Sequence, residues 1–561
     1  MRQIESTTRL QCPSILALAL LFFVEACRPQ SPAEKTNSPV TKKSPLTQVH
    51  AGRDLYRRHC AACHGVRGDG MGLAARFLSP KPRNFRAGKF RLVSTVNGVP
   101  TREDLSAVLV RGMNGSSMTP WLHLPVEDRE ALINEVLRLH RDGMREQYVS
   151  MLKQAKDLTD EEISQEDVQN EIRTFVKRRT TPGPSLMVPE IGKPTTESIA
   201  RGKTIYLEHS CHSCHGNEGQ GDGSKIQFDD EGFRTRPRDY TRGIFKGGYD
   251  TKSLYRRIAY GMPGTPMPAS TKLTVEENIT LVHFIRSLSD EETRSSALLR
   301  RQQIFVKHVA QTPGSSDSKQ WTEANSMRLQ MIPLWWHDNA NPKLVIQALH
   351  DKHTISVRLS WNDQTADRHA VTTTGFEDAV ALELFQGDAE PFVGMGDGKS
   401  DVEMWYWDAD RQNGAENLDI RYPRTVVDIY PFREEFADSA EFDRPATAPA
   451  SQPRISLPAL ASGNRIVPTD RAAHPTLSAN GPGTLSFRVP HSQLVKASGT
   501  WKDGKWTVVM TRTIAGEATS SHAVPLEPNT RASIAFAVWD GSKRDRDGKK
   551  LITIWHDLIL E

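Results

Sequence analysis

The pattern of apolar and polar positions divides the chain into a helical part and a later part made of strands. Residues 127–139 and 274–288 carry apolar side chains three and four positions apart, which is typical of amphipathic helices. Apolar and polar residues alternate in 355–361, 485–489 and 505–510, and Gly, Pro, Asn and Asp separate these stretches. We therefore predict a multidomain protein in which mainly α domains precede an antiparallel β-sandwich.

An internal repeat of about 150 residues indicates that the helical part consists of two related copies. A period of this length predicts duplicated domains, because solenoid repeats recur about every 20 to 50 residues. The second copy has one inserted residue after its His. The matching pairs are Tyr56 with Tyr206, His59 with His209, the Gly-rich segments 65–70 with 216–223, and Pro-Arg-Asn-Phe at 82–85 with Pro-Arg-Asp-Tyr at 237–240.

The composition is that of an ordinary water-soluble protein. Of 561 residues, 37% are hydrophobic and 25% are charged, which excludes a protein that crosses the membrane many times. The net charge of +4 is small, and Lys and Arg are interleaved with Asp and Glu. Nucleic acid is therefore not an expected partner.

The first 48 residues comprise an export signal and a polar tether. The apolar run at 15–24 is too short to span a bilayer and is followed by Cys27. The segment resembles a bacterial lipoprotein signal, in which Cys27 becomes the lipidated first residue, although Glu25 replaces the usual small residue. The alternative is ordinary cleavage, which leaves Cys27 as a free thiol. Residues 28–48 are rich in Pro, Ser and Lys and predict a solvated tether.

The six cysteines fall in the signal and in two CxxCH motifs. Cys12 lies within the signal and Cys27 at its end, so none is left for a structural disulfide. In an exported chain CxxCH indicates a covalently attached c-type haem, whose iron is ligated by the His. A lone motif can also mark a redox or zinc site, but two with matching surroundings favour haem. The residues concerned are Cys60, Cys63 and His64 in the first copy and Cys211, Cys214 and His215 in the second.

Each copy also offers a methionine as second axial ligand. Met is the usual partner of His in cytochromes c. In both copies a Met lies six residues beyond a Gly in a Gly- and Pro-containing loop, and we predict these, Met118 and Met267, as the ligands. Met113 and Met262 repeat equally well and are the competing candidates.

The two copies resemble class I cytochrome c domains, over 49–142 and 195–292. Alternation alone would indicate only a secreted sandwich, which is most often an adhesion, carbohydrate-binding or structural module. Ordered blocks within 327–561 are nevertheless similar to the haem-binding domain of the gamma subunit of ethylbenzene dehydrogenase. Relatives of that domain serve dimethylsulfide dehydrogenase, selenate and chlorate reductases and nitrite oxidoreductase. The blocks are 361–363, 376–382, 394–396 followed by 404–407, and 534–541.

This second resemblance implies a non-covalent b-type haem held between a Met and a Lys. The Met position falls on Met395 and the Lys position on Lys550, with the adjacent Lys549 as the next candidate. A ligating Lys must lose its proton, so its site has to exclude water. His337 and His369 are rivals, because imidazole is the commoner haem ligand.

The patterns and resemblances together predict seven segments and two mainly α cytochrome c domains before an antiparallel β-sandwich. The segments are a lipoprotein-type signal peptide (1–27), a disordered tether (28–48), cytochrome c domain 1 (49–142), a charged helical linker (143–194), cytochrome c domain 2 (195–292), a linker (293–326) and the ethylbenzene dehydrogenase-like haem-binding β-sandwich (327–561).

The expected function is electron transfer rather than catalysis. The resemblance implies a chain with two c-type haems and one b-type haem, anchored on the periplasmic side of a membrane. It would pass electrons between a molybdenum-enzyme complex with an iron–sulfur subunit and respiratory carriers. One alternative is a dihaem peroxidase, which needs an iron with an open coordination position. The other is a dihaem cytochrome whose β-sandwich binds a ligand other than haem.

Overall fold

The computed structural model describes residues 45–561 except for 88, 337–342, 352, 369–374, 388, 398–401, 413–475, 480, 482–483, 488–493 and 515–522. The predicted signal peptide, Cys27, most of the tether, His337 and His369 lie outside the described residues. Residues Pro45–Glu561 form one compact unit. Within the described residues, no helix has both the length and the apolar composition needed to cross a bilayer.

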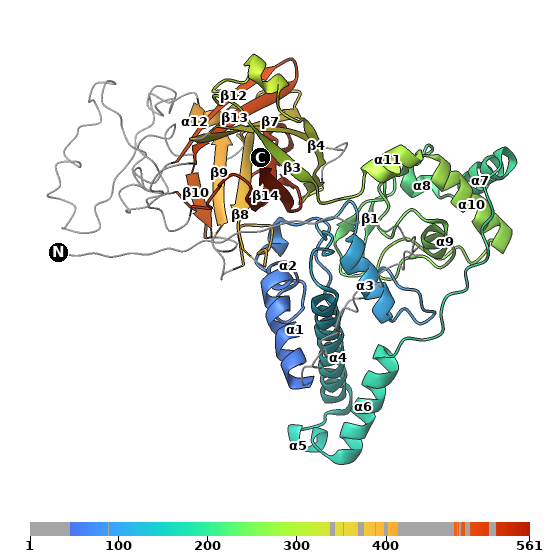
Figure 1. Ribbon diagram of the computed structural model, residues 1–561. Coiled ribbons are helices and arrows are strands. Elements are labelled where there is room, and N and C mark those ends of the chain that lie inside the picture. The colour runs from blue at the N-terminus through green and yellow to red at the C-terminus, as the bar shows by residue number, and fades with distance from the viewer. Residues whose placement is uncertain are drawn as a thin grey trace, which may run out of the picture. The chain divides into compact units, whose positions relative to one another are not determined.

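The first part of the chain is helical, and both CxxCH motifs begin short helices (Figure 1). The predicted helices at 127–139 and 274–288 are confirmed as parts of α4 and α10. The first copy contains α1 (Pro45–His59), α2 (Ala61–His64), α3 (Arg102–Arg111) and α4 (Val126–Lys156). The second contains α7 (Thr196–Glu208), α8 (His212–His215), α9 (Thr251–Ala259), α10 (Val275–Ser287) and α11 (Glu291–Ser296).

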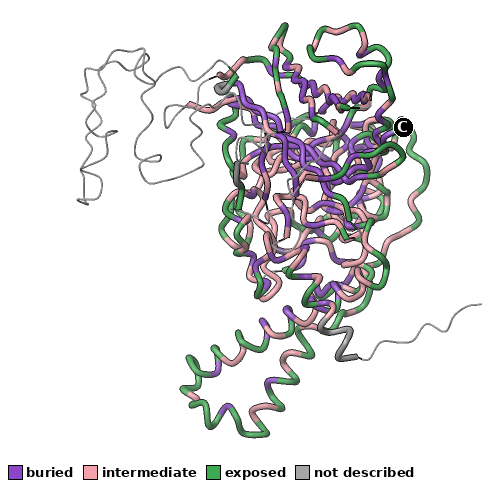
Figure 2. The backbone as a smooth tube through the Cα atoms, turned by 60° about the vertical axis from the view of Figure 1, so that its left-hand side comes forward, coloured by how far each residue is buried: buried purple, intermediate pink, exposed green. Residues whose placement is uncertain are grey.

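The predicted charged helical linker is largely helical, but its first helix does not start at residue 143. Helix α4 runs without interruption from the first copy into this segment and packs against α6 (Glu166–Thr180), with α5 (Asp160–Ile163) between them. Leu152, Ile163 and Ile172 are the buried residues of this contact. Figure 2 shows mostly exposed residues elsewhere along the pair, as expected for a helical hairpin with a narrow apolar stripe.

The C-terminal part is one large mixed sheet, so its strands are not all antiparallel as predicted. Its order is β11-β10-β9-β8-β14-β16-β3-β6-β7-β13-β12, with β4, β5 and β15 pairing at the side. The strands are β3 (Gln303–His308), β4 (Met327–Gln330), β5 (Ile332–Pro333), β6 (Lys343–His350), β7 (Thr354–Asn362), β8 (Ala379–Phe385), β9 (Val402–Asp408), β10 (Thr476–Ala479), β11 (Ser486–Phe487), β12 (Val495–Lys502), β13 (Lys505–Thr513), β14 (Arg531–Trp539), β15 (Leu551–Ile552) and β16 (His556–Leu560).

The prediction of an antiparallel sheet is wrong at β3. This strand pairs in parallel with β16 through residues 303–306 and with β6 through residues 307–308. It lies in the segment 293–326, which was expected to be a linker. A parallel pair requires a long connection, and β3 meets that requirement because most of the domain separates it from β16 in sequence.

One hydrophobic core lies between the two halves of the sheet. Buried residues of β8 and β14 pack with residues of β6, β7 and β13 in a single cluster. β3 contributes Ile304 and Val306 to this cluster, and Trp506 of β13 is fully buried in it. Figure 2 shows the buried residues concentrated in these strands. β3 is therefore an integral strand of the domain.

We predict that Ile304→Ala lowers the free energy of unfolding by about 2 to 5 kcal/mol, because it leaves a cavity between β16 and β6. Ile304 is 3% exposed, whereas Phe305 on the opposite face is 37% exposed. Phe305→Ala is thus the matched control and should cost under about 1 kcal/mol. Urea unfolding followed by tryptophan fluorescence measures both. Equal effects would mean that β3 does not belong to the core.

Candidate functional site

The first CxxCH motif opens into an apolar cavity. Helix α1 ends at His59, and Cys60 caps the short helix α2, which carries Cys63 and His64. These residues line a cavity together with apolar side chains of α3 and α4 and with both methionines of the loop that follows α3. The apolar lining residues are Phe85, Phe90, Leu92, Leu105, Val108, Leu109, Trp121, Leu132, Ile133 and Val136. The structure thus brings together every predicted residue of the first haem site.

His64 is oriented with one ring nitrogen free. Its Nδ1 lies 2.9 Å from the carbonyl oxygen of Arg83, so the Nδ1 tautomer donates a hydrogen bond to that carbonyl and leaves Nε2 as the lone-pair donor. The ring stacks on Phe85 at a centroid distance of 4.4 Å. Burial lowers the pKa of His64 to about 4, so the imidazole is neutral at physiological pH. A neutral, oriented imidazole is the form that ligates iron.

The thiols of the motif are not poised for dithiol redox chemistry. Burial raises the pKa of Cys60 to about 12 and that of Cys63 to about 12. Dithiol redox centres require readily formed thiolates, which depend on a lowered thiol pKa. The environment of these two residues therefore fits covalent attachment better than a dithiol redox centre.

Both methionine candidates of the first copy lie in one tight loop. The N–H of Met113 donates to the carbonyl of Met118 at 2.8 Å, and both residues line the cavity. Gly112 and Gly115 adopt φ of +73° and +71°, which disfavours any residue with a Cβ. The loop geometry places either sulfur near the cavity, so Met118 and Met113 remain competing candidates.

The second copy repeats this geometry. The N–H of Met262 donates to the carbonyl of Met267 at 3.1 Å, as in the first loop. Tyr206 donates to the carbonyl of Gly216 at 2.6 Å, as Tyr56 donates to Gly65 at 2.9 Å. The residue inserted in this copy is Ser210, which has a φ of +58° and so allows the chain to re-enter the shared path.

His215 has the same orientation with one difference. Its Nδ1 lies 3.4 Å from the carbonyl of Arg238, and burial lowers its pKa to about 4. Tyr240, which replaces Phe85 of the first copy, stacks on the ring and places its hydroxyl 3.1 Å from Nε2. Iron ligation at Nε2 would displace this hydroxyl. Burial also raises the pKa of Cys211, as in the first copy.

Charged residues of the two copies interlock. Arg83 of the first Pro-Arg tetrapeptide forms ion pairs with Asp230, at 3.3 Å, and with Glu231 of the second copy. Arg91 pairs with Asp229 at 2.7 Å, and their side chains are only 8% and 4% exposed. Buried pairs of this kind hold a contact in one register, because separating them leaves an unpaired charge.

The contact between the copies is reciprocal. A Cβ on Gly115, in the first Met loop, would lie 2.6 Å from Nη1 of Arg238 in the second copy. A Cβ on Gly264, in the second Met loop, would lie 3.2 Å from Nη1 of Arg83. Arg238 thus packs on the Met loop of the first copy, and Arg83 packs on the Met loop of the second. Lys246 of the second copy also lines the first cavity, where burial lowers its pKa well below the ordinary value.

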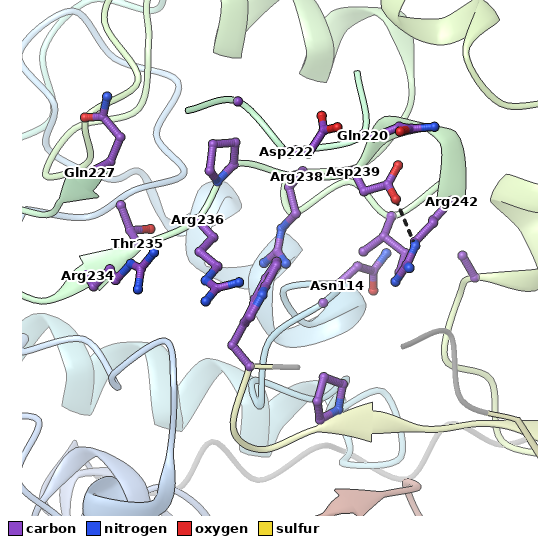
Figure 3. Close-up of a pocket in the computed structure, with 18 of the residues that line it drawn as sticks. Asn114, Gln220, Asp222, Gln227, Arg234, Thr235, Arg236, Arg238, Asp239 and Arg242 are labelled. Carbon is purple, nitrogen blue, oxygen red and sulfur yellow. Dashed lines mark ion pairs between the residues drawn. The ribbon is translucent and has the colours of Figure 1, made fainter. Parts of the chain in front are cut away.

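A basic pocket of about 420 Å³ lies beside the second copy. In Figure 3, Arg234, Arg236 and Arg238 come from one segment, while Arg242 pairs with Asp239 at 2.9 Å. Arg238 has buried Nε and Nη2 atoms without a hydrogen-bond partner among the described residues. Burial lowers its pKa to about 10. Unsatisfied guanidinium donors in a pocket favour a carboxylate ligand.

The structure also brings Met395 and Lys550 to one face of the sheet, where both adjoin Glu383. The N–H of Met395 donates to Oε2 of Glu383 at 3.4 Å. Burial lowers the pKa of Lys550, and the nearby Glu383 carboxylate opposes this effect. Burial in turn raises the pKa of Glu383 to about 7. Met395 has a φ of +81°, a strained conformation for a residue with a side chain.

The surroundings of Lys550 suit the predicted iron ligand better than those of Lys549. Lys550 is 8% exposed, and its Nζ lies 4.6 Å from the ring centroid of Trp539, whereas Lys549 lies over Trp335. Trp539 packs with short side chains, Ala379, Ala381 and Ala537, on the same face. An apolar face of this kind suits a flat hydrophobic group and a neutral amine.

The β domain contacts the first CxxCH region directly. Ser79 donates its N–H to the carbonyl of Leu334 at 2.9 Å, and Leu334 donates to the carbonyl of Lys550 at 2.9 Å. Phe392, three residues before Met395, lines the first cavity. The Met395 and Lys550 face therefore adjoins the first CxxCH site.

Several residues of these sites were not predicted from the sequence. Phe392 and Lys246 reach the first cavity from distant segments, and no local pattern marks them. Glu383 gave a usable signal, because it interrupts an apolar strand and a charge buried in a sheet needs a reason.

Three family models match the chain. The ethylbenzene dehydrogenase model matches residues 318–551, the cytochrome c model matches 199–289, and the model of subunit III of cbb3-type cytochrome c oxidase matches 47–134. The three matched regions follow one another along the chain without overlap. The resemblance inferred from the sequence is thereby confirmed.

Curated relatives are haem or gamma subunits. A Haloferax mediterranei protein assigned as a respiratory nitrate reductase heme subunit is 26% identical over 39% of this chain and 56% of its own length. The dimethylsulfide dehydrogenase gamma subunit of Rhodovulum sulfidophilum is 25% identical over 43% of this chain and 73% of its length. The chlorate reductase gamma subunit of Ideonella dechloratans is 27% identical over 39% and 65%.

We predict that Asp229→Asn lowers the free energy of unfolding by about 3 to 5 kcal/mol, because it leaves the Arg91 guanidinium buried and unpaired. Limited proteolysis should then cut more readily between the two copies. Glu166→Gln is the control, because Glu166 pairs with Arg173 at a surface where both side chains are more than half exposed, and it should cost under about 1 kcal/mol. If the two variants are equally stable, the buried pair does not hold the copies together.

Proposed function

We propose that this chain is a multihaem electron relay and that it does not catalyse a substrate reaction itself. The observation that carries the proposal is the arrangement of the three sites. The Met395 and Lys550 face adjoins the first CxxCH cavity through Ser79 and Leu334, and the first copy adjoins the second through interlocked charges. This order suits stepwise transfer from one end to the other.

In this proposal two cytochrome c domains, at 49–142 and 195–292, follow one another and precede the β domain. Cys60 and Cys63 attach one c-type haem and Cys211 and Cys214 attach the second. His64 with Met118, and His215 with Met267, ligate the two irons. Met395 and Lys550 hold a non-covalent b-type haem. Bound haem would supply a one-electron couple.

The chain's own residues tune these sites. The carbonyls of Arg83 and Arg238 fix the tautomers of the two histidines. Apolar side chains exclude water from the first cavity, which strengthens every electrostatic interaction inside it. Burial lowers the pKa of Lys550 and so favours the neutral amine, which can donate a lone pair.

The basic residues between the two copies would bind haem carboxylates in this proposal. The structure leaves Nε of Arg83, Arg91 and Arg238 without hydrogen-bond partners among the described residues. Lys246 also lines the first cavity, where a neighbouring carboxylate would favour its protonated form against the effect of burial. We assign this group to the carboxylates of the two c-type haems, since charge-assisted bonds from guanidinium to carboxylate are strong. The residues that would hold the haem carboxylates thus lie at the contact between the copies.

The named relatives support a place in a redox complex. They are haem or gamma subunits associated with nitrate reductase, dimethylsulfide dehydrogenase and chlorate reductase. We propose that this chain likewise works beside a molybdenum enzyme and its iron–sulfur subunit and passes electrons to or from respiratory carriers. Its proposed location is the periplasmic side of a membrane, with a lipid anchor at Cys27.

We predict three haems per chain when the protein is made in a host with working cytochrome c maturation. Acid-acetone extraction should leave two haems bound and release one. Lys550→Ala and Met395→Ala should each change the axial ligand field of the released haem, while Lys549→Ala, the neighbouring control, should leave it nearly unchanged. Pyridine haemochrome spectra measure the number and type of haems, and low-temperature electron paramagnetic resonance spectra measure the axial ligand field.

Other results would contradict the assignment. Fewer than two covalent haems would refute the CxxCH sites, and a bis-histidine spectrum would refute the Met395 and Lys550 pair. A protein that holds only covalent haem would favour a β domain that binds another ligand. A high-spin iron with peroxidase turnover would favour the dihaem peroxidase.

We predict that Met118→Ala and Met267→Ala each abolish the weak methionine-to-iron absorption band of one haem and lower its reduction potential. The matched controls are Met113→Ala and Met262→Ala, five residues earlier in the same loops, which should keep the band. Spectroelectrochemical titration measures both quantities. Loss of the band in the controls instead would show that the other methionine is the ligand.

A further inference from the structure

Four carboxylates converge at one end of the β domain. They are Asp363, Asp367, Asp378 and Asp540. Asp363 directly follows β7, Asp378 directly precedes β8, and Asp540 directly follows β14. β8 and β14 are paired, with Ala379 opposite Trp539. Strand pairing therefore places Asp378 and Asp540 side by side, and the end of β7 brings Asp363 to them.

The oxygens are close enough to share one ion. Each residue offers a carboxylate oxygen, and these oxygens all lie within 4.8 Å of one another. Asp363 and Asp378 are 4% and 0% exposed. Within the described residues, no Lys, Arg or His forms an ion pair with any of the four. Buried carboxylates without a cation are costly, so the group needs compensation.

One oxygen of the group lacks a partner. Oδ1 of Asp363 accepts the N–H of Thr365 at 3.2 Å, but its buried Oδ2 has no hydrogen-bond partner among the described residues. Asp378 is different, because it accepts from the indole N–H of Trp506 at 2.9 Å and from two backbone N–H groups. A buried carboxylate oxygen without a partner, on a residue grouped with three other carboxylates, can serve as a cation ligand.

We propose that Asp363, Asp367, Asp378 and Asp540 bind one calcium ion. Hard divalent cations prefer oxygen ligands, and the absence of His and Cys from the group argues against zinc. Calcium–oxygen bonds of about 2.4 Å span about 4.8 Å from ligand to ligand across the ion. Magnesium at about 2.1 Å spans only about 4.2 Å. The spread of the oxygens therefore fits calcium.

The competing arrangement is a shared proton. Burial and the neighbouring Asp378 charge raise the pKa of Asp363 to about 8, and burial raises the pKa of Asp378 to about 6. Protons could thus neutralise the group in part. A proton shared by two carboxylates leaves Asp367 and Asp540 uncompensated, whereas one divalent ion serves all four. The two arrangements differ in their response to chelators.

The ion would also stabilise the Met395 and Lys550 face, which the proposed function assigns to the b-type haem. Ala379 and Trp539, which follow Asp378 and precede Asp540 in sequence, belong to the apolar face beside Lys550. Calcium would therefore join the ends of β7, β8 and β14 and fix two of the strands that form this face.

The test uses the full chain, stripped with EGTA and then titrated with calcium chloride. Atomic spectroscopy should find about one calcium per chain before stripping, and calcium should raise the unfolding temperature of the stripped protein. Asp363→Asn keeps the oxygen that accepts from Thr365 and removes the charge. This substitution should weaken calcium binding at least tenfold and abolish the calcium-induced rise in unfolding temperature. Asp540→Asn, at the more exposed edge of the group, is the second variant if Asp363→Asn does not fold.

The control is Asp351→Asn, at the opposite end of β7. Asp351 accepts three backbone N–H groups, so this variant should be less stable yet keep the full calcium-induced rise. Three outcomes would overturn the proposal: no bound calcium, an equal rise with magnesium, or a calcium response that persists in Asp363→Asn. Higher stability of Asp363→Asn in EGTA together with no calcium response in the unmodified chain would assign the group to a shared proton.

Discussion

Burial of basic nitrogen groups is the constraint on which the proposed haem sites depend. His64, His215 and Lys550 all have a pKa lowered by desolvation, so each is held in or moved toward the neutral form that can donate a lone pair. The histidines are also aimed, because backbone carbonyls occupy Nδ1 in both. Secondary structure serves this end. Short helices present the CxxCH residues to a cavity, and a sheet face of alanines lies beside Lys550.

The second organising feature is the charge between the two copies. Acidic residues 229–231 of one copy neutralise Arg83 and Arg91 of the other, yet several guanidinium atoms remain without partners. A contact made only for stability would be expected to satisfy these donors. The incomplete pairing therefore fits an interface arranged around additional negative groups.

The sequence was informative where chemistry is local and less so where it is not. Motif spacing predicted His64 and both Met loops, and helix periodicity predicted α4 and α10. Motif spacing also ranked Met118 above Met113, and this choice stays a prediction, because a tight loop brings both residues to one cavity. The segment of β3 was predicted to be a linker. A pattern of six residues does not identify a partner strand, and β16 lies more than 200 positions away. The four carboxylates are likewise separated in sequence and converge only because β7, β8 and β14 end together.

The position of β3 also bears on how such a chain could arise by gene fusion. A strand encoded immediately after the second cytochrome copy is inserted between β16 and β6, so the module boundary in sequence is not a boundary in space. Recombination that cut at residue 327 would remove the partner of β16 along residues 557–560 and of the end of β6 at 349–350, and unpaired strand edges promote association with other chains. Exchange of the cytochrome part for another would therefore have to retain the strand, and the two parts are expected to be inherited together.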